Sequence, residues 1–506
     1  MDRVRSLLAA LDRSDFSVLG RLYLGPGRWL DVRPSTYLLI LAIGAVWVAA
    51  VAWVAWRITR RGKPGTGGSA AAGGAADRQA SRSLFAGALV LYLGVGAYVT
   101  FVYPPTTDEP HYLLLAESLV RDGDIALAGN YANGDYRRFY PVTGLDPHTV
   151  IVPGGEMYSQ HTIGLPLAVL PGYAVAGRWG VLAILCAMGA SLVAALYRLA
   201  RNAGVNARSA WLTAILTAAT APLAFASTLV FTDVPAALLT AVALGATGSA
   251  WVPAVCAAGL PWLHPRFAVI AAGLLALNLL RTRSRGRTIG AWALAAVVSG
   301  SAFFAVYHGP ALVSALNVLT ERYPAKLEEL SGATVSGNIA PRYALLGLLA
   351  KAFDRSFGVV PYAPWFILLI PGIFLAARRR RFPHVDLLVA GGAYAALTCL
   401  YRNWAGSAYP GRTVVALLPF LFPYLAAGVE WAGVTSGRRR ALTLLVGVAL
   451  ATAWLLTAVP VLRYTSGRDW MGAKAGVAWR AMPFTWFPAF ELQTAPPAPC
   501  CEEPEE

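Results

Sequence analysis

Long, continuous apolar segments recur along this chain. Each is near the roughly 20 residues that a helix needs to cross a bilayer, and none alternates apolar and polar positions as strands of a membrane barrel do. We therefore predict an all-α polytopic membrane protein with about 11–12 transmembrane helices. The predicted spans are 35–56, 84–103, 179–200, 210–231, 234–250, 251–263, 266–281, 288–307, 359–377, 385–401, 412–432 and 441–461. The segment 251–263 would be only about 20 Å long as a helix, which is short for a complete span. The number of transmembrane helices is therefore least certain within 234–281.

Composition supports this class. The 506 residues are 57% hydrophobic and 13% charged, with a mean hydropathy of +0.54. Arginine and lysine cluster in alternate connections, which predicts that these connections are cytoplasmic. The clusters are Arg57 to Lys63, Arg198 to Arg208, Arg281 to Arg287, Arg378 to Arg381 and Arg438 to Arg440. The net charge of +16 is therefore explained by topology and by attraction to anionic lipid headgroups. Nucleic-acid binding is not expected, because the sequence shows no basic face interleaved with aromatic residues.

The sequence divides into four parts. Residues 1–60 form an N-terminal segment with an accessory transmembrane helix, and residues 61–83 read as a flexible cytoplasmic linker because they are rich in glycine and alanine. A transmembrane bundle follows over 84–461. The tail 462–506 ends in a Pro/Glu-rich stretch of disordered composition. The side of the membrane on which the N-terminus lies is left undecided. The span order places residues 1–34 outside the cell, but their arginines favour the cytoplasmic side.

The first long connection, 104–162, lies outside the cell in this topology and is acidic. It begins with Thr107-Asp108-Glu109-Pro110-His111-Tyr112, which places two adjacent carboxylates at the end of a predicted span. Ionised side chains at a membrane boundary indicate a functional site. A short amphipathic helix along the membrane surface is predicted over 110–120. Capping of this helix by Thr107 or Asp108 is the structural alternative.

Two further motifs are predicted at the same membrane face. Thr232-Asp233-Val234-Pro235 brings another carboxylate there, again with helix capping as the alternative. His264-Pro265-Arg266-Phe267 interrupts an apolar stretch, and an arginine within a span costs about 3 kcal/mol unless it faces a wet cavity or an anion. We therefore favour a functional role for Arg266 over a structural ion pair.

Carboxylates and guanidinium groups at one membrane face suit sugar transfer from a lipid phosphate. A carboxylate can remove the proton of an acceptor hydroxyl as it attacks an anomeric carbon, and guanidinium groups can stabilise the charge on the departing phosphate. The hydrocarbon tail of the donor would stay in lipid. The sequence contains no Walker A motif and no Gly-x-Gly-x-x-Gly motif after a strand, so a nucleotide-binding domain is not expected.

These motifs resemble the GT-C glycosyltransferases, in particular the bacterial protein-mannosyltransferase-like, lipid A aminoarabinose transferase-like and Rgt-like enzymes. The resemblance covers roughly 84–432. It rests on Asp108-Glu109, Thr232-Asp233-Val234-Pro235, Arg266, Gln160-His161-Thr162-Ile163-Gly164-Leu165-Pro166-Leu167, and Tyr409-Pro410-Gly411-Arg412 through Leu418-Pro419. Three features depart from the family pattern. Arg266 stands where a lysine is more common, Thr413 replaces a tyrosine after Arg412, and no large C-terminal extracytoplasmic domain follows the bundle.

The resemblance implies a polyprenyl-phosphate sugar as donor and a glycan, lipid or protein as acceptor. Transfer would proceed with inversion outside the cytoplasmic membrane. Asp108 would be the general base, and Glu109 would orient the acceptor or support the base. Arg266, with Arg412, would hold the lipid phosphate, and the remaining candidates for substrate binding are His111, Tyr112, His161, Asp233 and His264.

Two alternatives remain open from the sequence. Five histidines on the predicted external side, namely His111, His148, His161, His264 and His308, invite a divalent metal with Asp108 or Glu109 as partner, but none has dedicated ligand spacing. A transporter or flippase for a lipid-linked sugar or other anionic substrate would also place ionisable residues along a membrane path. The short segments around 251–281 could form its broken helix, although no second copy of that pattern occurs.

Overall fold

The protein is almost entirely helical in the computed structural model. This model describes residues 21–25, 28–31, 70–141, 144–151, 156–246, 248–307, 344–379, 385–400, 409–458 and 487–488. Within these ranges the only strands form two antiparallel pairs, β1 (Arg21–Gly25) with β2 (Arg28–Asp31) and β3 (Thr149–Ile151) with β4 (Met157–Ser159). The predicted all-α membrane fold is therefore confirmed.

Four helices are long and apolar enough to cross a membrane among the described residues. They are α3 (Ala70–Val102), α6 (Gly164–Asn202), α12 (Arg285–Val306) and α20 (Ser436–Ala458). Shorter apolar helices are α9 (Asp233–Gly245), α10 (Trp251–Leu263), α16 (Leu369–Arg378), which continues the 3-10 turn η5 (Pro364–Leu368), and α17 (Val385–Leu400). The other helices are α4 (Glu109–Arg121), α5 (Ala128–Asn133), η1 (Asp135–Arg138), α7 (Ala207–Ala219), α8 (Leu223–Ala226), η2 (Pro265–Phe267), α11 (Ala268–Arg281), α15 (Ala344–Phe353), α18 (Arg412–Val415) and α19 (Leu418–Ala432).

Several predicted spans are interrupted. The segment 210–231 is divided into α7 and α8, because the chain leaves the helix at Thr220, just before Ala221 and Pro222. Proline cannot donate to a helical carbonyl and disfavours the helical conformation of the residue before it. α6 is longer than predicted and is broken at Ala176 and Gly177. Fewer continuous spans therefore occur in the described residues than the hydrophobic pattern indicates.

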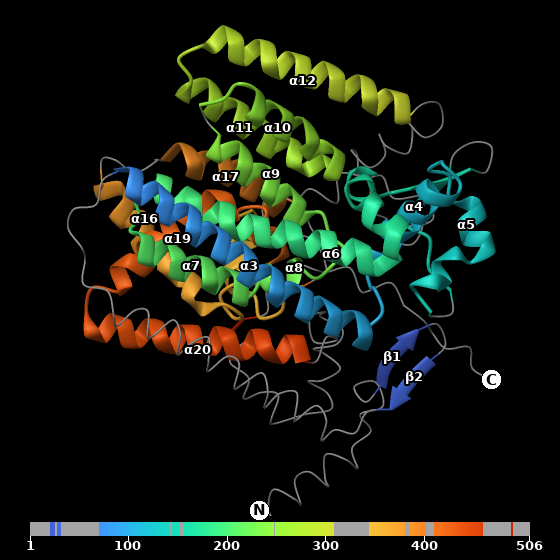
Figure 1. Cartoon of the computed structure of the whole chain (residues 1–506), viewed down its shortest axis with the longest axis horizontal. Coiled ribbons are helices and arrows are strands. Elements are labelled where there is room, and N and C mark those ends of the chain that lie inside the picture. Colours follow the sequence, from blue (N-terminus) through green and yellow to red (C-terminus); the bar gives the residue numbers. More distant parts are fainter. Residues whose placement is uncertain are drawn as a thin grey trace, which may run out of the picture.

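The bundle is built around α6 and α19 (Figure 1). α3 lies along α6, α16 packs on α19, and α10 and α11 carry α12 at the edge of the molecule. α19 is buried over most of its length, whereas α12 exposes large apolar side chains such as Val297, Val298 and Phe304. A helix that is apolar and exposed in this way has a face suited to lipid.

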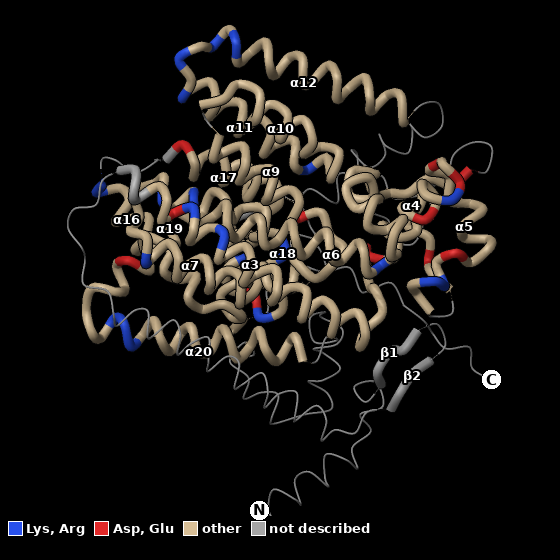
Figure 2. Tube along the Cα trace, viewed as in Figure 1, with Lys and Arg blue, Asp and Glu red and all other residues tan. Residues whose placement is uncertain are grey.

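Charged residues divide the bundle into two ends (Figure 2). The arginines around the turn between α11 and α12, at the end of α16 and at the start of α20 lie at one end, and the acidic loop that carries α4 and α5 lies at the other. This separation is the one that the positive-inside rule predicts for a polytopic membrane protein.

Two predicted segments differ in the structure. α4 occupies the predicted surface helix, but its residues from Glu109 to Ser118 are all buried. It is thus enclosed by protein instead of lying with one face in lipid. α3 begins at Ala70, within the predicted linker 61–83, so the second half of that linker is helical. The predicted span 35–56, His308 and all but two residues of the tail 462–506 lie outside the described residues.

Candidate active site

Asp108 stands at the entrance of α4 and does not cap it. Asp108 occupies the N-cap position, yet its side chain makes no cap hydrogen bond. The preceding Thr107 has a φ of 54°, which is uncommon for a β-branched residue and turns the chain sharply into the helix. The Asp108 carboxylate instead accepts a hydrogen bond from Arg412 Nη2 at 3.0 Å. The capping alternative is therefore wrong for this side chain.

Asp233 likewise makes ion pairs in place of a cap. Thr232 holds the N-cap position of α9 without a side-chain cap, and Asp233 is fully buried in the first turn. One oxygen of Asp233 accepts from Arg266 Nη2 at 2.9 Å, and the other accepts from Arg412 Nε at 3.2 Å. Asp108, Arg412, Asp233 and Arg266 thus form a continuous series of alternating charges, which we call the charge chain.

Arg412 is the centre of the charge chain, and the fold fixes it closely. Gly411 precedes it with a φ of 73°, a conformation that glycine adopts without strain, and its N–H donates to the carbonyl of Phe357. The Arg412 guanidinium lies over the Phe231 ring, with its central carbon 4.4 Å from the ring centroid. Only 6% of the Arg412 side chain is exposed. Charges buried in this way are stable only when they are paired.

Glu109 and His264 position other members of the site. Glu109 is buried, and its carboxylate accepts from the backbone N–H groups of Val230 and Thr106, which ties α4 to the loop before α9. His264 Nδ1 accepts from the backbone N–H of Arg266 at 3.2 Å, and so fixes the turn η2. Both side chains hold backbone in place, so direct contact with a substrate is not required to explain them.

Three histidines surround Asp108. The rings of His111 and His148 are stacked, with centroids 3.9 Å apart, and His161 lies 5.7 Å from His148. His111 Nδ1 shares a hydrogen bond of 3.0 Å with the Tyr131 hydroxyl. Tyr112 is buried, and its ring lies 4.7 Å from that of His161. The structure therefore brings the predicted substrate-binding residues His111, Tyr112 and His161 together with His148, which was predicted only as a metal candidate.

Arg412 controls the electrostatics of Asp108. Burial alone would raise the pKa of Asp108, but the positive charge of Arg412, with contributions from His161 and His148, holds that pKa below its ordinary value. Asp108 is fully ionised at neutral pH, but it is a weak base while Arg412 remains paired with it.

A divalent metal fits beside Asp108. One carboxylate oxygen of Asp108 and one ring nitrogen each of His148 and His161 lie within 4.8 Å of one another. His161 Nε2 is buried and has no hydrogen-bond partner among the described residues. Burial lowers the pKa of His161 to about 4, so the ring is neutral at pH 7 and keeps a lone pair for a metal. One carboxylate and two imidazoles are a donor set suited to zinc or a similar transition metal.

An apolar cavity of about 540 Å³ lies between α6, α9, α10 and α12. Its lining includes Pro235, close to Asp233 in the chain, and Leu263, which comes just before the His264 turn. The polar groups of Trp262 and Ser299 bond to each other and to a backbone carbonyl. The cavity is therefore suited to a hydrocarbon group.

One charged residue near the site was missed from the sequence. Lys351 on α15 is buried, and its Nζ donates to the hydroxyl of Thr413 at 3.3 Å. Thr413 is the residue that replaces a tyrosine of the GT-C pattern after Arg412, and the structure gives it Lys351 as a partner. A lysine within the apolar run Leu345 to Phe353 was the signal that could have found it.

No protein-family model matches the chain, and no curated protein matches it. The chain is similar to solved structures of the oligosaccharyltransferase AglB from Archaeoglobus fulgidus. One, in complex with an inhibitory peptide and a dolichol-phosphate, has 15% identity and a TM-score of 0.38 over 83% of this chain and 61% of that one. Another, in complex with Zn and sulfate, has 14% identity and a TM-score of 0.39 over 79% and 57%.

Both of these structures are described as oligosaccharyltransferases. This chain spans about three fifths of their length. We base the functional proposal on this chain's own residues.

Proposed function

We propose that this protein is a membrane glycosyltransferase of the GT-C type. It would transfer a sugar from a polyprenyl-phosphate donor to a hydroxyl of a glycan, lipid or protein, with inversion, on the extracytoplasmic side of the cytoplasmic membrane. One observation carries the proposal. A partly exposed carboxylate, Asp108, is linked through Arg412 and Asp233 to Arg266. An apolar cavity that suits a hydrocarbon chain is lined by Pro235 and Leu263, which are close in sequence to Asp233 and Arg266.

The charge chain supports a phosphate site. Two arginines converge on Asp233, and the buried Nε of Arg266 has no hydrogen-bond partner among the described residues. An N–H donor in that position costs free energy unless an acceptor reaches it. A phosphate oxygen is a suitable acceptor, because guanidinium groups bind phosphate with charge-assisted hydrogen bonds. The apolar cavity next to Pro235 and Leu263 would hold the first part of the donor's tail.

Asp108 would act as the base in the transfer step. The acceptor oxygen attacks the anomeric carbon, its proton passes to Asp108, and the bond between that carbon and the phosphate oxygen breaks. Arg266 and Arg412 would stabilise the charge that develops on the phosphate. A phosphate bound to Arg412 would also weaken the hydrogen bond from Arg412 to Asp108. Donor binding would thereby raise the basicity of Asp108 at the moment when a base is needed.

The test is transfer of a radiolabelled sugar from a panel of polyprenyl-phosphate monosaccharides to cell-envelope acceptors. Asp108→Asn is expected to lower turnover by about 10²- to 10⁴-fold, the usual contribution of a general base. The matched control is Asp146→Asn, an exposed carboxylate of the same loop, which is expected to keep wild-type turnover. Equal turnover of Asp108→Asn and wild type would exclude the base role. Donor binding without transfer by the wild type would favour a carrier, to be tested by translocation in liposomes.

Metal assistance is a second candidate, favoured by the buried His161 Nε2 without a described partner. Asp108, His148 and His161 would hold the ion, which would supply positive charge near the donor phosphate. Elemental analysis of the purified protein before and after dialysis against a chelator measures the content directly. We expect one divalent ion per chain in wild type and a lower content in His161→Ala. Metal-free protein with full turnover would leave Asp108 as a base alone.

A further inference from the structure

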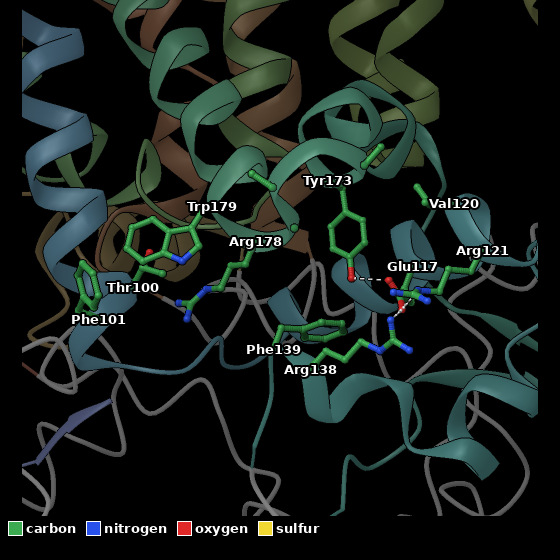
Figure 3. Close-up of a pocket in the computed structure, with 13 residues that line it drawn as sticks. Thr100, Phe101, Glu117, Val120, Arg121, Arg138, Phe139, Tyr173, Arg178 and Trp179 are labelled. Carbon is green, nitrogen blue, oxygen red and sulfur yellow. Dashed lines mark hydrogen bonds and ion pairs between the residues drawn. The ribbon is translucent and has the colours of Figure 1, made fainter. Parts of the chain in front are cut away.

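A second pocket, of about 690 Å³, is lined by residues of α3, α4 and α6 and of the loop that follows α4 (Figure 3). Glu117 contributes to its wall about two and a half helical turns after Asp108, and therefore from the opposite face of the helix. No member of the charge chain and none of the three histidines around Asp108 lines this pocket. It is thus separate from the candidate active site.

The pocket has an excess of positive charge at one side. Glu117 is buried, and one of its oxygens pairs with both Arg121 Nε and Arg138 Nη1, at 2.5 and 2.8 Å. The other oxygen accepts from the Tyr173 hydroxyl at 2.9 Å. Arg121 and Arg138 are 54% and 46% exposed, so their remaining N–H groups are accessible. Two guanidinium groups share one carboxylate here, and the surplus charge faces the opening.

The other side of the pocket is aromatic and lies at the ends of two spans. Phe101 comes from the last turn of α3, and Trp179 follows the break in α6. Their rings meet edge to face at 4.8 Å, and both side chains are exposed. Arg178, also in the wall, donates two N–H groups to the carbonyl of Tyr103 just after α3. Aromatic rings and arginines at span ends are typical of the depth of lipid headgroups.

We propose that this pocket binds the phosphate headgroup of an anionic membrane phospholipid. The phosphate would meet Arg121 and Arg138, and the upper part of an acyl chain would lie against Phe101 and Trp179 (Figure 3). Guanidinium groups match the geometry of a phosphate. A lipid without net charge would leave the positive charge of Arg121 and Arg138 unbalanced, whereas an anionic lipid would balance it. The volume is within the range of small-molecule sites. A bound lipid would join α3, α4 and α6, and so steady the helix that begins at Asp108.

The test uses the full-length protein in detergent, titrated with phosphatidylglycerol and with phosphatidylcholine, and resolves single bound lipids by native mass spectrometry. Wild type is expected to retain phosphatidylglycerol in preference to phosphatidylcholine. Arg138→Gln is expected to reduce that preference by a factor of up to about ten, because one charge-assisted hydrogen bond is lost. Arg137→Gln is the matched control, because Arg137 belongs to the same turn and is also exposed, but does not line the pocket.

Each outcome decides the proposal. A preference that Arg138→Gln leaves unchanged, or that Arg137→Gln reduces equally, would overturn it, since surface charge alone would then explain the binding. Displacement of the lipid by inorganic phosphate at equal concentration would assign the pocket to free phosphate and overturn the lipid source. Arg138→Lys keeps the positive charge but lacks the planar set of N–H donors of arginine. We expect it to show a lipid preference between those of Arg138→Gln and wild type. Glu117 keeps Arg121 and Tyr173 as partners in these variants, so folding is expected to be retained.

Discussion

Asp108 and Glu117 are two carboxylates on opposite faces of α4, and arginine binds each of them in a different way. Asp108 is 24% exposed, but its partner Arg412 is buried and also pairs with the buried Asp233. Glu117 is buried, but its partners Arg121 and Arg138 are exposed. The charge chain therefore balances two arginines with two carboxylates and keeps its arginines largely buried, whereas the two arginines that share Glu117 are exposed.

This difference separates two uses of an ion pair. In the charge chain each arginine is desolvated, so removing one partner strands the others in a medium of low dielectric constant. Around Glu117 the arginines keep much of their hydration, so each pair contributes little to stability and remains able to exchange its partner. We therefore expect large effects on folding from changes at the first site and small effects from changes at the second.

The largest effect is expected for Arg412→Ala. This change leaves the buried carboxylate of Asp233 with Arg266 alone and removes the partner of Asp108. We expect a loss of about 3–5 kcal/mol in the free energy of unfolding, because a buried charge loses its compensation. Thermal unfolding in detergent measures it. Arg379→Ala, which breaks the more exposed pair with Glu430, is the control, and we expect a loss below about 1 kcal/mol there.

The double variant Asp108→Asn with Arg412→Gln sharpens this test. It removes one negative and one positive charge together and leaves Asp233 paired with Arg266. We expect it to unfold at a higher temperature than Arg412→Gln alone, which leaves Asp108 without its partner. If the two variants were equally unstable, the loss would come from packing and not from an unpaired charge.

The sequence located the members of the charge chain but not their pairing. Asp108, Asp233, Arg266 and Arg412 all stood out because ionised side chains are rare and costly next to apolar spans. Arg412 reaches Asp108 and Asp233 across 304 and 179 positions of the chain, and no local pattern encodes contacts of that separation. For the same reason, the stacking of His148 on His111 became visible only in the fold.

The helix boundaries show a similar limit. Hydrophobicity predicted the helix α10 with its observed bounds, and it located α17 and α12 closely. It failed where backbone geometry breaks a continuous apolar run at Thr220, because hydropathy does not report φ and ψ. Lys351 was missed because α15 is too short to have been predicted as a span.

A smaller effect is expected for the glycines that set up the two arginines. Gly411 precedes Arg412 and Gly134 precedes the turn that carries Arg138, with φ of 73° and 68°. Replacement of either by alanine places a side chain in the left-handed region, at a cost of about 1–2 kcal/mol. A Cβ at Gly411 would also lie 3.0 Å from the ring of Pro222, whereas at Gly134 it would meet only the flexible Arg137 side chain. We expect Gly411→Ala to be the more destabilising in thermal unfolding. The reverse order would mean that the α18 turn can shift freely.

The smallest effect is expected for Glu117→Gln. The amide keeps an oxygen for the Tyr173 hydroxyl, and the two arginines that lose their ion pairs are exposed and can hydrate. We expect a loss of about 1 kcal/mol in the free energy of unfolding, as for a partly solvated ion pair. Urea unfolding followed by circular dichroism measures it. A loss as large as that of Arg412→Ala would contradict the distinction between the two faces of α4, because it would show that Glu117 and its arginines are as dependent on one another as the charge chain.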